Sequence, residues 1–314
     1  MIVVLSGGTG GAKLVQGLAC LLPPQNLTVI VNTGDDVDWW GLHVSPDVDS
    51  ILYALAGSLS TDSGWGLQGD SFRCVERMTA FGQPSWFRLG DLDLATHLAR
   101  TNLLRAGKTL SVATAELAHA LGIRSRVLPM SDDRVATLID TPKGVLNFQE
   151  YFVRERHQVE VRAVHFEGAE KAAPAPGLLA CIATAEAVIF APSNPVTSIG
   201  PILAVPGIRD ALRSTSAPIA AVSPIIDGDA VSGPAAILMK RKGWPSTIGG
   251  VAQAYEDFLD LLVVDLEDHA DADHLREGGL HVLCANTVMK TMQDKQELAR
   301  FTLHAALQAR GSKN

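Results

Sequence analysis

The chain has 314 residues, 47% of them hydrophobic, and a mean hydropathy of +0.17, which is enough to bury one or two large cores. Its formal net charge of −8 argues against a nucleic-acid-binding surface. The four cysteines form no C-x-x-C pair and no apolar run reaches about 18 residues, so we expect a protein of the reducing cytoplasm, with no structural zinc site and no membrane span.

The amino terminus predicts a phosphate-binding turn. A buried strand over residues 2–5 runs into a glycine-rich segment, and the apolar spacing of residues 12–22 is that of a helix. Glycines allow positive φ and a close approach of the backbone to a ligand, and the helix directs its free N–H groups and positive dipole end at the turn. The residues expected to bind the phosphates of a donor nucleotide are Gly7, Gly8, Thr9, Gly10 and Lys13.

Two well-known glycine fingerprints do not fit this turn. A Walker A loop fails because the six-residue frame from Gly7 ends on Ala12, and Leu14 stands where a magnesium-binding hydroxyl belongs. The dinucleotide fingerprint fails because Lys13 replaces its third glycine, which disfavours a nicotinamide-dependent dehydrogenase even though Asp35 lies near its ribose-binding position. A tight turn with no ligand remains the structural alternative.

Acidic residues follow the second β-branched run. Asp35, Asp36 and Asp38 come at its carboxyl end, where an open parallel sheet places its ligands. Two more acids open the next helical segment; helix capping explains Asp47, whereas Asp49 lies on another side of the first turn and can face the same crevice. Carboxylates from such positions hold Mg²⁺ against a diphosphate. Asp35, Asp36 and Asp49 are therefore the candidate metal ligands and catalytic residues.

The composition changes between residues 61 and 176, where most of the aromatic residues lie and short helical runs alternate with strand-like ones. We interpret this segment as an inserted mixed α+β lobe that covers one side of the sheet. Residues 1–60 and 177–314 then form a doubly wound, mostly parallel α/β core of the Rossmann-like kind, and residues 1–314 form a single catalytic domain. Within the lobe, Arg88 and Asp91 begin a polar cluster, whereas His97 is expected to be a capping or surface histidine.

Regular α/β structure resumes with buried strands at residues 187–191 and 219–222. Each strand ends in a polar, proline-containing turn, and the first of these turns contributes Ser193 and Asn194 as further expected donor contacts. The tail predicts helices over residues 251–259 and 298–308 and strands over residues 261–264 and 280–284. An acidic loop between them lacks the glycine and the downstream glutamate of an EF-hand, so we assign it no chemistry.

Seven motifs, in order, resemble the 2-phospho-L-lactate transferases of deazaflavin coenzyme F-420 biosynthesis. They lie at residues 6–13, 32–36, 46–49, 89–97, 128–133, 192–201 and 223–226. The resemblance implies a magnesium-dependent transferase that uses small-molecule substrates. A guanosine diphosphate ester of lactate, enolpyruvate or glycerate would give its acid-bearing phosphoryl group to the terminal hydroxyl of 7,8-didemethyl-8-hydroxy-5-deazariboflavin (Fo), and GMP would leave.

The resemblance also implies roles for individual residues. Asp49 and Arg88 match positions that contact Fo, and acids of the Asp35, Asp36 and Asp49 type are tied to metal. Residues 35–41 form a longer and more aromatic segment than the family pattern, which leaves open which of its acids is the ligand. The planar ring system of Fo needs an apolar wall, for which the candidates are Trp39, Trp40, Trp65 and Trp86, although core packing is expected for most of them.

Two further expectations accompany this reading. A homodimer is expected from the general prevalence of symmetric oligomers among soluble enzymes. The alternative function is a non-catalytic, nucleotide-sugar-binding regulatory protein of the same fold. Such a regulator would keep the glycine-rich turn but would have no need of Asp49 and Arg88 as contacts for an acceptor.

Overall fold

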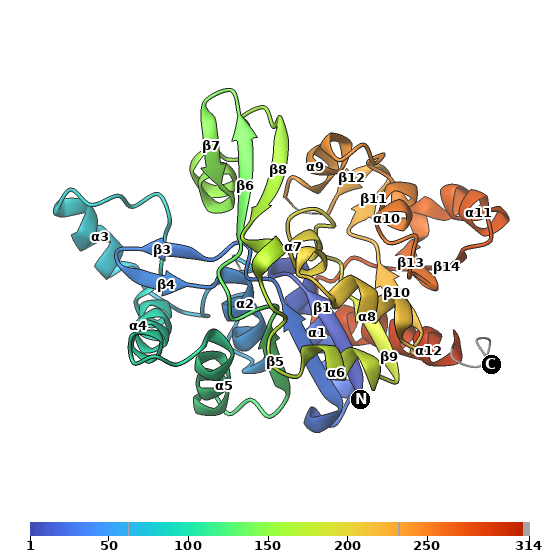
Figure 1. Ribbon diagram of the computed structural model, residues 1–314, viewed down its shortest axis with the longest axis horizontal. Coiled ribbons are helices and arrows are strands. Elements are labelled where there is room, and N and C mark those ends of the chain that lie inside the picture. Colours follow the sequence, from blue (N-terminus) through green and yellow to red (C-terminus); the bar gives the residue numbers. More distant parts are fainter. Residues whose placement is uncertain (62, 232, 310–314) are drawn as a thin grey trace.

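The computed structural model describes residues 1–61, 63–231 and 233–309. Its centre is a seven-stranded sheet in the order β14-β13-β10-β9-β1-β2-β5, and every neighbouring pair is parallel (Figure 1). The strands are β1 (Ile2–Ser6), β2 (Leu27–Val31), β5 (Arg126–Pro129), β9 (Ala187–Phe190), β10 (Ile219–Val222), β13 (Leu261–Asp265) and β14 (His281–Ala285). The predicted doubly wound parallel α/β fold is confirmed.

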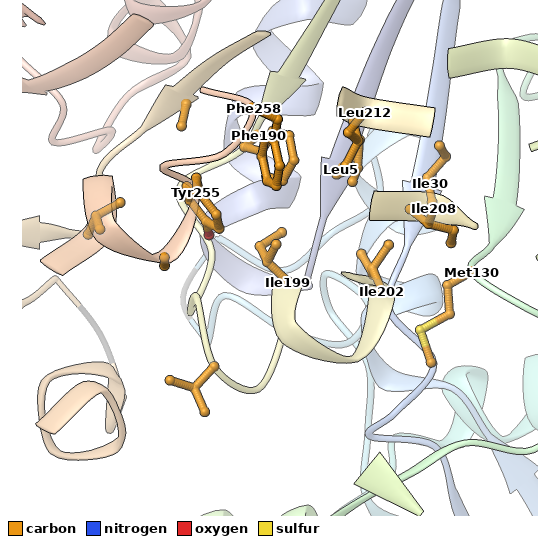
Figure 2. Packing of buried hydrophobic residues seen from close by; sticks show 14 of the residues in the cluster. Leu5, Ile30, Met130, Phe190, Ile199, Ile202, Ile208, Leu212, Tyr255 and Phe258 are labelled. Carbon is orange, nitrogen blue, oxygen red and sulfur yellow. The ribbon is translucent and has the colours of Figure 1, made fainter. Parts of the chain in front are cut away.

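Helices cover both faces of the sheet, which is why the central strands are apolar at nearly every position. In β1, Ile2 and Val4 face one core cluster, and Val3 and Leu5 face the other. Figure 2 shows the second cluster, in which helix residues such as Ile199 and Leu212 pack over the sheet. The first cluster is covered by α1 (Thr9–Leu21), α2 (Pro46–Leu55), α5 (Leu110–Ala120) and α12 (Met292–Ala309), and the second by α6 (Leu178–Ala183), α7 (Ile199–Ala204), α8 (Ile208–Ser214) and α10 (Ile248–Ala254).

The direction of winding reverses between β1 and β9. The chain passes from β1 outward to β2 and β5, and then returns to begin the other half of the sheet at β9. At such a switch point the loops leaving the two central strands diverge and leave a crevice for ligands. Here the two loops contact each other, because the N–H of Gly7 donates a hydrogen bond of 3.0 Å to Ser193 Oγ.

Elements outside the central sheet gather in what we call the lobe, and their range is not the predicted 61–176. The lobe projects beyond the carboxyl ends of the strands (Figure 1), and the hairpin that precedes residue 61 lies beside it. Conversely, β5 falls inside the predicted range yet extends the central sheet, because Val127 and Leu128 are buried against the two core clusters. The elements are β3 (Val37–Trp39), β4 (Leu42–Val44), α3 (Arg73–Ala80), α4 (Asp91–Arg105), β6 (Ala136–Thr141), β7 (Gly144–Asn147), a π-helical turn (Glu150–Arg154) and β8 (Ala163–Glu167).

The carboxyl-terminal half contains the remaining short elements. The helix predicted over residues 251–259 is α10, which begins at Ile248 and ends at Ala254. Beyond its end, the Phe258 ring stacks on the Phe190 ring, with 5.4 Å between the ring centroids. No helix among the described residues is both long and apolar enough to span a membrane. The other elements are β11 (Ile225–Ile226), β12 (Asp229–Ala230), α9 (Ala235–Arg241), α11 (His269–Glu277) and 3-10 turns at Pro24–Asn26, Ala169–Lys171 and Leu266–Asp268.

Candidate functional site

A cavity of about 280 Å³ opens at the carboxyl ends of β1 and β2, between α2 and the lobe. One side of it is polar, and the other is a wall of aromatic rings. The polar lining comprises Thr9, Asp35, Asp47, Asp49, Ser50, Arg88, Asp93, His97 and Gln149, and the aromatic lining comprises Tyr53, Trp65, Trp86, Phe87, Phe148 and Phe152. The cavity therefore has a polar side, at the carboxyl ends of the strands and the start of α1, and an apolar side of aromatic rings that suits a flat ring system.

The glycine-rich turn is built differently from the prediction. None of its glycines has a positive φ. They are required because neighbouring protein groups press against the turn: a Cβ on Gly8 would lie 2.5 Å from Asp47 Oδ1, and one on Gly7 would lie 2.6 Å from Ser198 Oγ. The next residue, Thr9, begins α1 and lines the cavity. The turn thus brings the amino end of α1 against the acidic side of the site.

Asp47 lies at the centre of that acidic side, although the sequence pattern suggested only a capping role. Its Oδ2 accepts a hydrogen bond of 2.9 Å from Asn32 Nδ2, and its carboxylate accepts one from the N–H of Gly8. Burial, with the neighbouring charge of Asp36, raises the pKa of Asp47 to about 7. Sequence reasoning also missed Asn32. The signal for both was present, because Asn32 follows directly on β2 and Asp47 comes three residues after the end of β4.

Asp35 and Asp36 complete a group of three crowded carboxylates. Burial, followed by the charges of Asp47 and Asp36, raises the pKa of Asp35 well above its usual range. Asp36 Oδ2 is held by Ser45 Oγ at 2.8 Å and by His43 Nε2 at 2.9 Å. The Oδ1 atoms of Asp35 and Asp36 are buried and have no hydrogen-bond partner among the described residues. Buried acids with unused oxygens and like-charged neighbours are the surroundings that a divalent cation would stabilise.

Asp49, the other predicted ligand, lies in a separate network. Its Oδ1 is bonded to Arg100 Nη2, and its Oδ2 accepts a hydrogen bond of 3.1 Å from Arg100 Nη1. The Arg100 side chain is completely buried. Asp49 also lies beside His97, whose Nδ1 is 3.5 Å from Asp49 Oδ2. The His97 side chain is only 1% exposed, so the expectation of a surface or capping histidine is wrong: its ring packs between α2 and α4.

The network extends from Asp49 on α2 to a second carboxylate, Asp93, which lies on α4. Asp93 Oδ1 lies 3.3 Å from His97 Nε2 and accepts a hydrogen bond of 2.6 Å from Tyr53 Oη. Although burial opposes it, the contacts with His97 and Tyr53 hold the pKa of Asp93 below its usual range. One atom each of Asp49, Asp93 and His97 could meet at a metal, since these atoms lie within 4.8 Å of one another. The Arg100 guanidinium already balances the charge of Asp49, which lessens the need for a cation at this place.

The remaining predicted residues divide between the cavity and its surroundings. Arg88 lines the cavity, and its guanidinium lies 4.2 Å above the centre of the Phe72 ring. Asn194 Oδ1 accepts the N–H of Val196 at 2.9 Å and so shapes the turn after β9, as Ser193 does through Gly7. Lys13 is not in the cavity lining: its charge acts on Lys295, where α1 packs against α12.

Asp38 and the four candidate tryptophans also divide between the cavity and its surroundings. The Asp38 side chain is 66% exposed, 3.9 Å from Arg134, and does not line the cavity. Trp65 and Trp86 do line it, whereas Trp39 is buried in a small core with its ring centroid 4.8 Å from that of Trp86. Trp40 Nε1 donates a hydrogen bond of 3.0 Å to the carbonyl oxygen of Pro84. Two of the four candidate tryptophans therefore belong to the cavity wall.

Comparison with known proteins explains why these groups occur together. Residues 2–298 match the model of the family described as 2-phospho-L-lactate transferase CofD. The chain belongs to this family. Members of the 2-phospho-L-lactate transferase family are enzymes, so the predicted transferase of coenzyme F-420 biosynthesis is confirmed at that level.

Two relatives differ in the acid that their names specify. A protein of Methanosarcina mazei named 2-phospho-L-lactate transferase is 40% identical over 304 residues, covering 97% of this chain and all of the relative. A protein of Streptomyces griseus named phosphoenolpyruvate transferase is 41% identical over 315 residues, covering 98% and 99%. A solved structure of a UPF0052 family protein from Bacillus halodurans has the same fold, with a TM-score of 0.64 and 17% identity over 96% of this chain and 99% of that one.

Proposed function

We propose that this transferase moves the phosphorylated three-carbon acid of a guanosine diphosphate ester to the terminal hydroxyl of Fo, releasing GMP, in a magnesium-dependent reaction. Family membership and the names of the relatives support the reaction class. The structural observation that supports it best is a cavity in which two buried, like-charged carboxylates, Asp35 and Asp47, and the start of α1 meet an aromatic wall. Such a cavity offers a charged side to the phosphates of a donor and an apolar side to a flat acceptor.

The donor diphosphate is assigned to the α1 side. The amino end of α1 carries unpaired N–H groups and the positive end of the helix dipole, and no acidic side chain lies in its first turn. Thr9 adds a hydroxyl where α1 borders the cavity. Ser193 and Asn194 support this side indirectly by holding the turn that contacts Gly7. Lys13 remains a predicted phosphate contact.

Magnesium is assigned to Asp35, Asp36 and Asp47. The unused Oδ1 atoms of Asp35 and Asp36 and the raised pKa values of Asp35 and Asp47 fit a hard cation with oxygen ligands. When bound, Mg²⁺ neutralises charge on a diphosphate and on the leaving nucleotide. Asp49 is also a predicted metal ligand, but we assign it to binding of the acceptor, because both of its oxygens already bond to Arg100.

The acceptor ring system is assigned to the aromatic wall. Trp65, Trp86 and Phe87 offer flat apolar surfaces, and Arg88 lies beside them. Asp49 accepts a hydrogen bond from the terminal hydroxyl and so directs its oxygen toward the donor. That oxygen forms a bond to the acid-bearing phosphorus, the bond from this phosphorus to the GMP oxygen breaks, and the hydroxyl proton is released. Such a transfer depends on in-line positioning and charge neutralisation more than on covalent help from the protein.

The test is an incubation of the protein with Fo, Mg²⁺ and each of the three guanylated acids, followed by mass analysis of the deazaflavin product. We expect one acid to give the phosphodiester of Fo together with GMP, and excess EDTA to abolish the product. Binding of a guanine diphosphate ligand without product from any donor would contradict transfer and support the nucleotide-binding regulator. Product formation that EDTA leaves unchanged would contradict only the role of magnesium.

A further inference from the structure

A buried polar layer lies between α2 and α4, behind the cavity. Its members are Asp49 and Tyr53 on α2 and Asp93, His97 and Arg100 on α4. The α2 residues are four apart and the α4 residues are spaced by four and three, so each set lies on one face of its helix. We call these five side chains the α2–α4 layer. Two helices that could have packed through apolar side chains are joined instead by charges.

Stability does not account for the innermost pair. Arg100 is completely buried and Asp49 is 4% exposed, so folding removes both charges from water. A buried ion pair of this kind is often no more stabilising than well-packed apolar side chains of the same volume. The pair does, however, hold a carboxylate in one orientation, because two guanidinium nitrogens bond to two different oxygens. Asp49 is also the member of that pair that lines the cavity.

We propose that Arg100 is a positioning residue: it fixes the plane of the Asp49 carboxylate so that this carboxylate directs the acceptor hydroxyl toward the donor phosphorus. The inference rests on the proposed function, and it adds a residue that contacts neither substrate. Arg100 is absent from the cavity lining, so it acts on the reaction through its neighbours: through Asp49, which it bonds at two points, and through His97, whose Nδ1 lies 3.4 Å from Arg100 Nη1. His97 lies against the Asp49 Oδ2 edge and Asp93 holds His97, which limits rotation of the carboxylate on that side.

The first experiment compares Arg100→Lys with Arg105→Lys, a matched change on the same helix. Arg105 is exposed and donates to the carbonyl oxygen of Gly41, outside the cavity. A lysine at position 100 keeps the charge but loses the two-point contact. We expect Arg100→Lys to lower kcat by about tenfold or more and to leave the donor KM within about twofold, because the lost interaction serves orientation. Arg105→Lys should match the wild type.

The second experiment measures binding without turnover. Fluorescence titrations, with no donor present, give the Kd of Fo and of a synthetic Fo analogue lacking the terminal hydroxyl. The wild type should bind Fo more tightly than the analogue, and Arg100→Lys should lose most of that difference while binding the analogue with the wild-type Kd. If Arg100 served only the stability of the fold, Arg100→Lys would raise the Kd of Fo and the Kd of the analogue by the same factor. In an Asp49→Asn background, Arg100→Lys should produce no further loss of kcat.

The outcomes separate this inference from the proposed function. If the wild type makes no product with any donor, the proposed function fails. If the wild type is active and Arg100→Lys equals it in kcat and in discrimination between the two ligands, only the positioning role fails. Additive losses in the Asp49→Asn background would also overturn it. Arg100→Gln serves as a second variant, and if both variants lose the native fold while Arg105→Lys keeps it, Arg100 is a structural residue and the proposal is wrong.

Discussion

Asp47 and Asp49 are two residues apart on one helix, yet their surroundings give them different chemistry. Asp47 faces Asn32, the glycine-rich turn and two other acids, with no cationic side chain bonded to it among the described residues. Asp49 faces Arg100, which balances its charge inside the protein. An acid of the first kind attracts a cation or a proton, whereas one of the second kind is held in one orientation by its partner. The two predictions at this scale follow from that difference.

Asp47 should make stability depend on pH when Mg²⁺ is absent. Its folded pKa of about 7 lies above the unfolded value of about 4. Stability from this group is therefore fully present below about pH 4 and is lost as the pH rises through 7. In EDTA, the unfolding temperature should fall from pH 5 to pH 8 more steeply for the wild type than for Asp47→Asn, as measured by differential scanning fluorimetry. Parallel curves for the two proteins would contradict the raised pKa.

Asp49→Asn should reduce turnover without abolishing donor binding. The amide keeps the shape of the site but loses the negative charge and one of the two acceptor oxygens, which weakens its hold on the acceptor hydroxyl, so kcat should fall by about two orders of magnitude, on the order of 3 kcal/mol. Asp49→Ala is less informative, because it would leave the buried Arg100 charge unpaired and threaten the fold. The control is Asp38→Asn, an exposed acid outside the cavity. Activity of Asp49→Asn near that of the control would remove Asp49 from the mechanism.

At the scale of elements, the glycine-rich turn lets neighbouring parts of the protein pack closely together. It lies between β1 and α1 and receives α2 on one side, through Asp47, and the loop after β9 on the other, through Ser193. Side chains on the turn would separate these parts. Glycine is therefore needed here for close approach of protein to protein, and not for positive φ.

Gly10→Ala tests that reading. A Cβ at this position would overlap the backbone carbonyl oxygen of Pro192, which cannot rotate away as a side chain could. We expect a loss of about 1–3 kcal/mol in the free energy of unfolding, measured by urea denaturation. In the control, Gly249→Ala within α10, the new Cβ would meet only ordinary contacts, with Thr247 Oγ1 at 3.4 Å, and stability should stay equal or rise by under about 1 kcal/mol. Equal losses in the two variants would contradict this account.

At the scale of the whole molecule, the cavity depends on two parts of the chain that are distant in sequence. The sheet supplies the acids and the start of α1, while the lobe supplies Trp86, Phe148 and the other rings. The carboxyl-terminal elements around α11 lie at the opposite end of the molecule from α3 and α4 (Figure 1). A ligand in the cavity should therefore link the lobe to the sheet and leave the far end unaffected.

Hydrogen exchange can detect that link. On addition of Fo, amide exchange should slow in segments 86–93 and 148–153, which line the cavity from the lobe, because a bound ligand raises the free energy of local opening. Exchange in α11 should not change, and that helix serves as the internal control. Protection confined to α11, or absent from segments 86–93 and 148–153, would show that the acceptor binds elsewhere.

Local pattern alone determined a large part of this protein. The β-branched strands, the apolar spacing of the helices and the polar turns at strand ends predicted a doubly wound sheet, because both faces of a parallel sheet must be covered by apolar helix surfaces. The same patterns brought Thr9, Asp35 and Asp49 into the candidate site, the family resemblance added Arg88, and all four line one cavity.

Only the tertiary structure decided which neighbours each charge has. Nothing in the order of residues shows that Arg100 reaches Asp49 across 51 positions, that Asp47 contacts Gly8, or that the charge of Lys13 acts on Lys295. Those contacts depend on how α1, α2 and α4 pack, and the ionisation of a buried group depends on what surrounds it in space. Sequence therefore indicated the residue types of the site, and folding determined which carboxylates were left available for a cation and which one was held by an arginine.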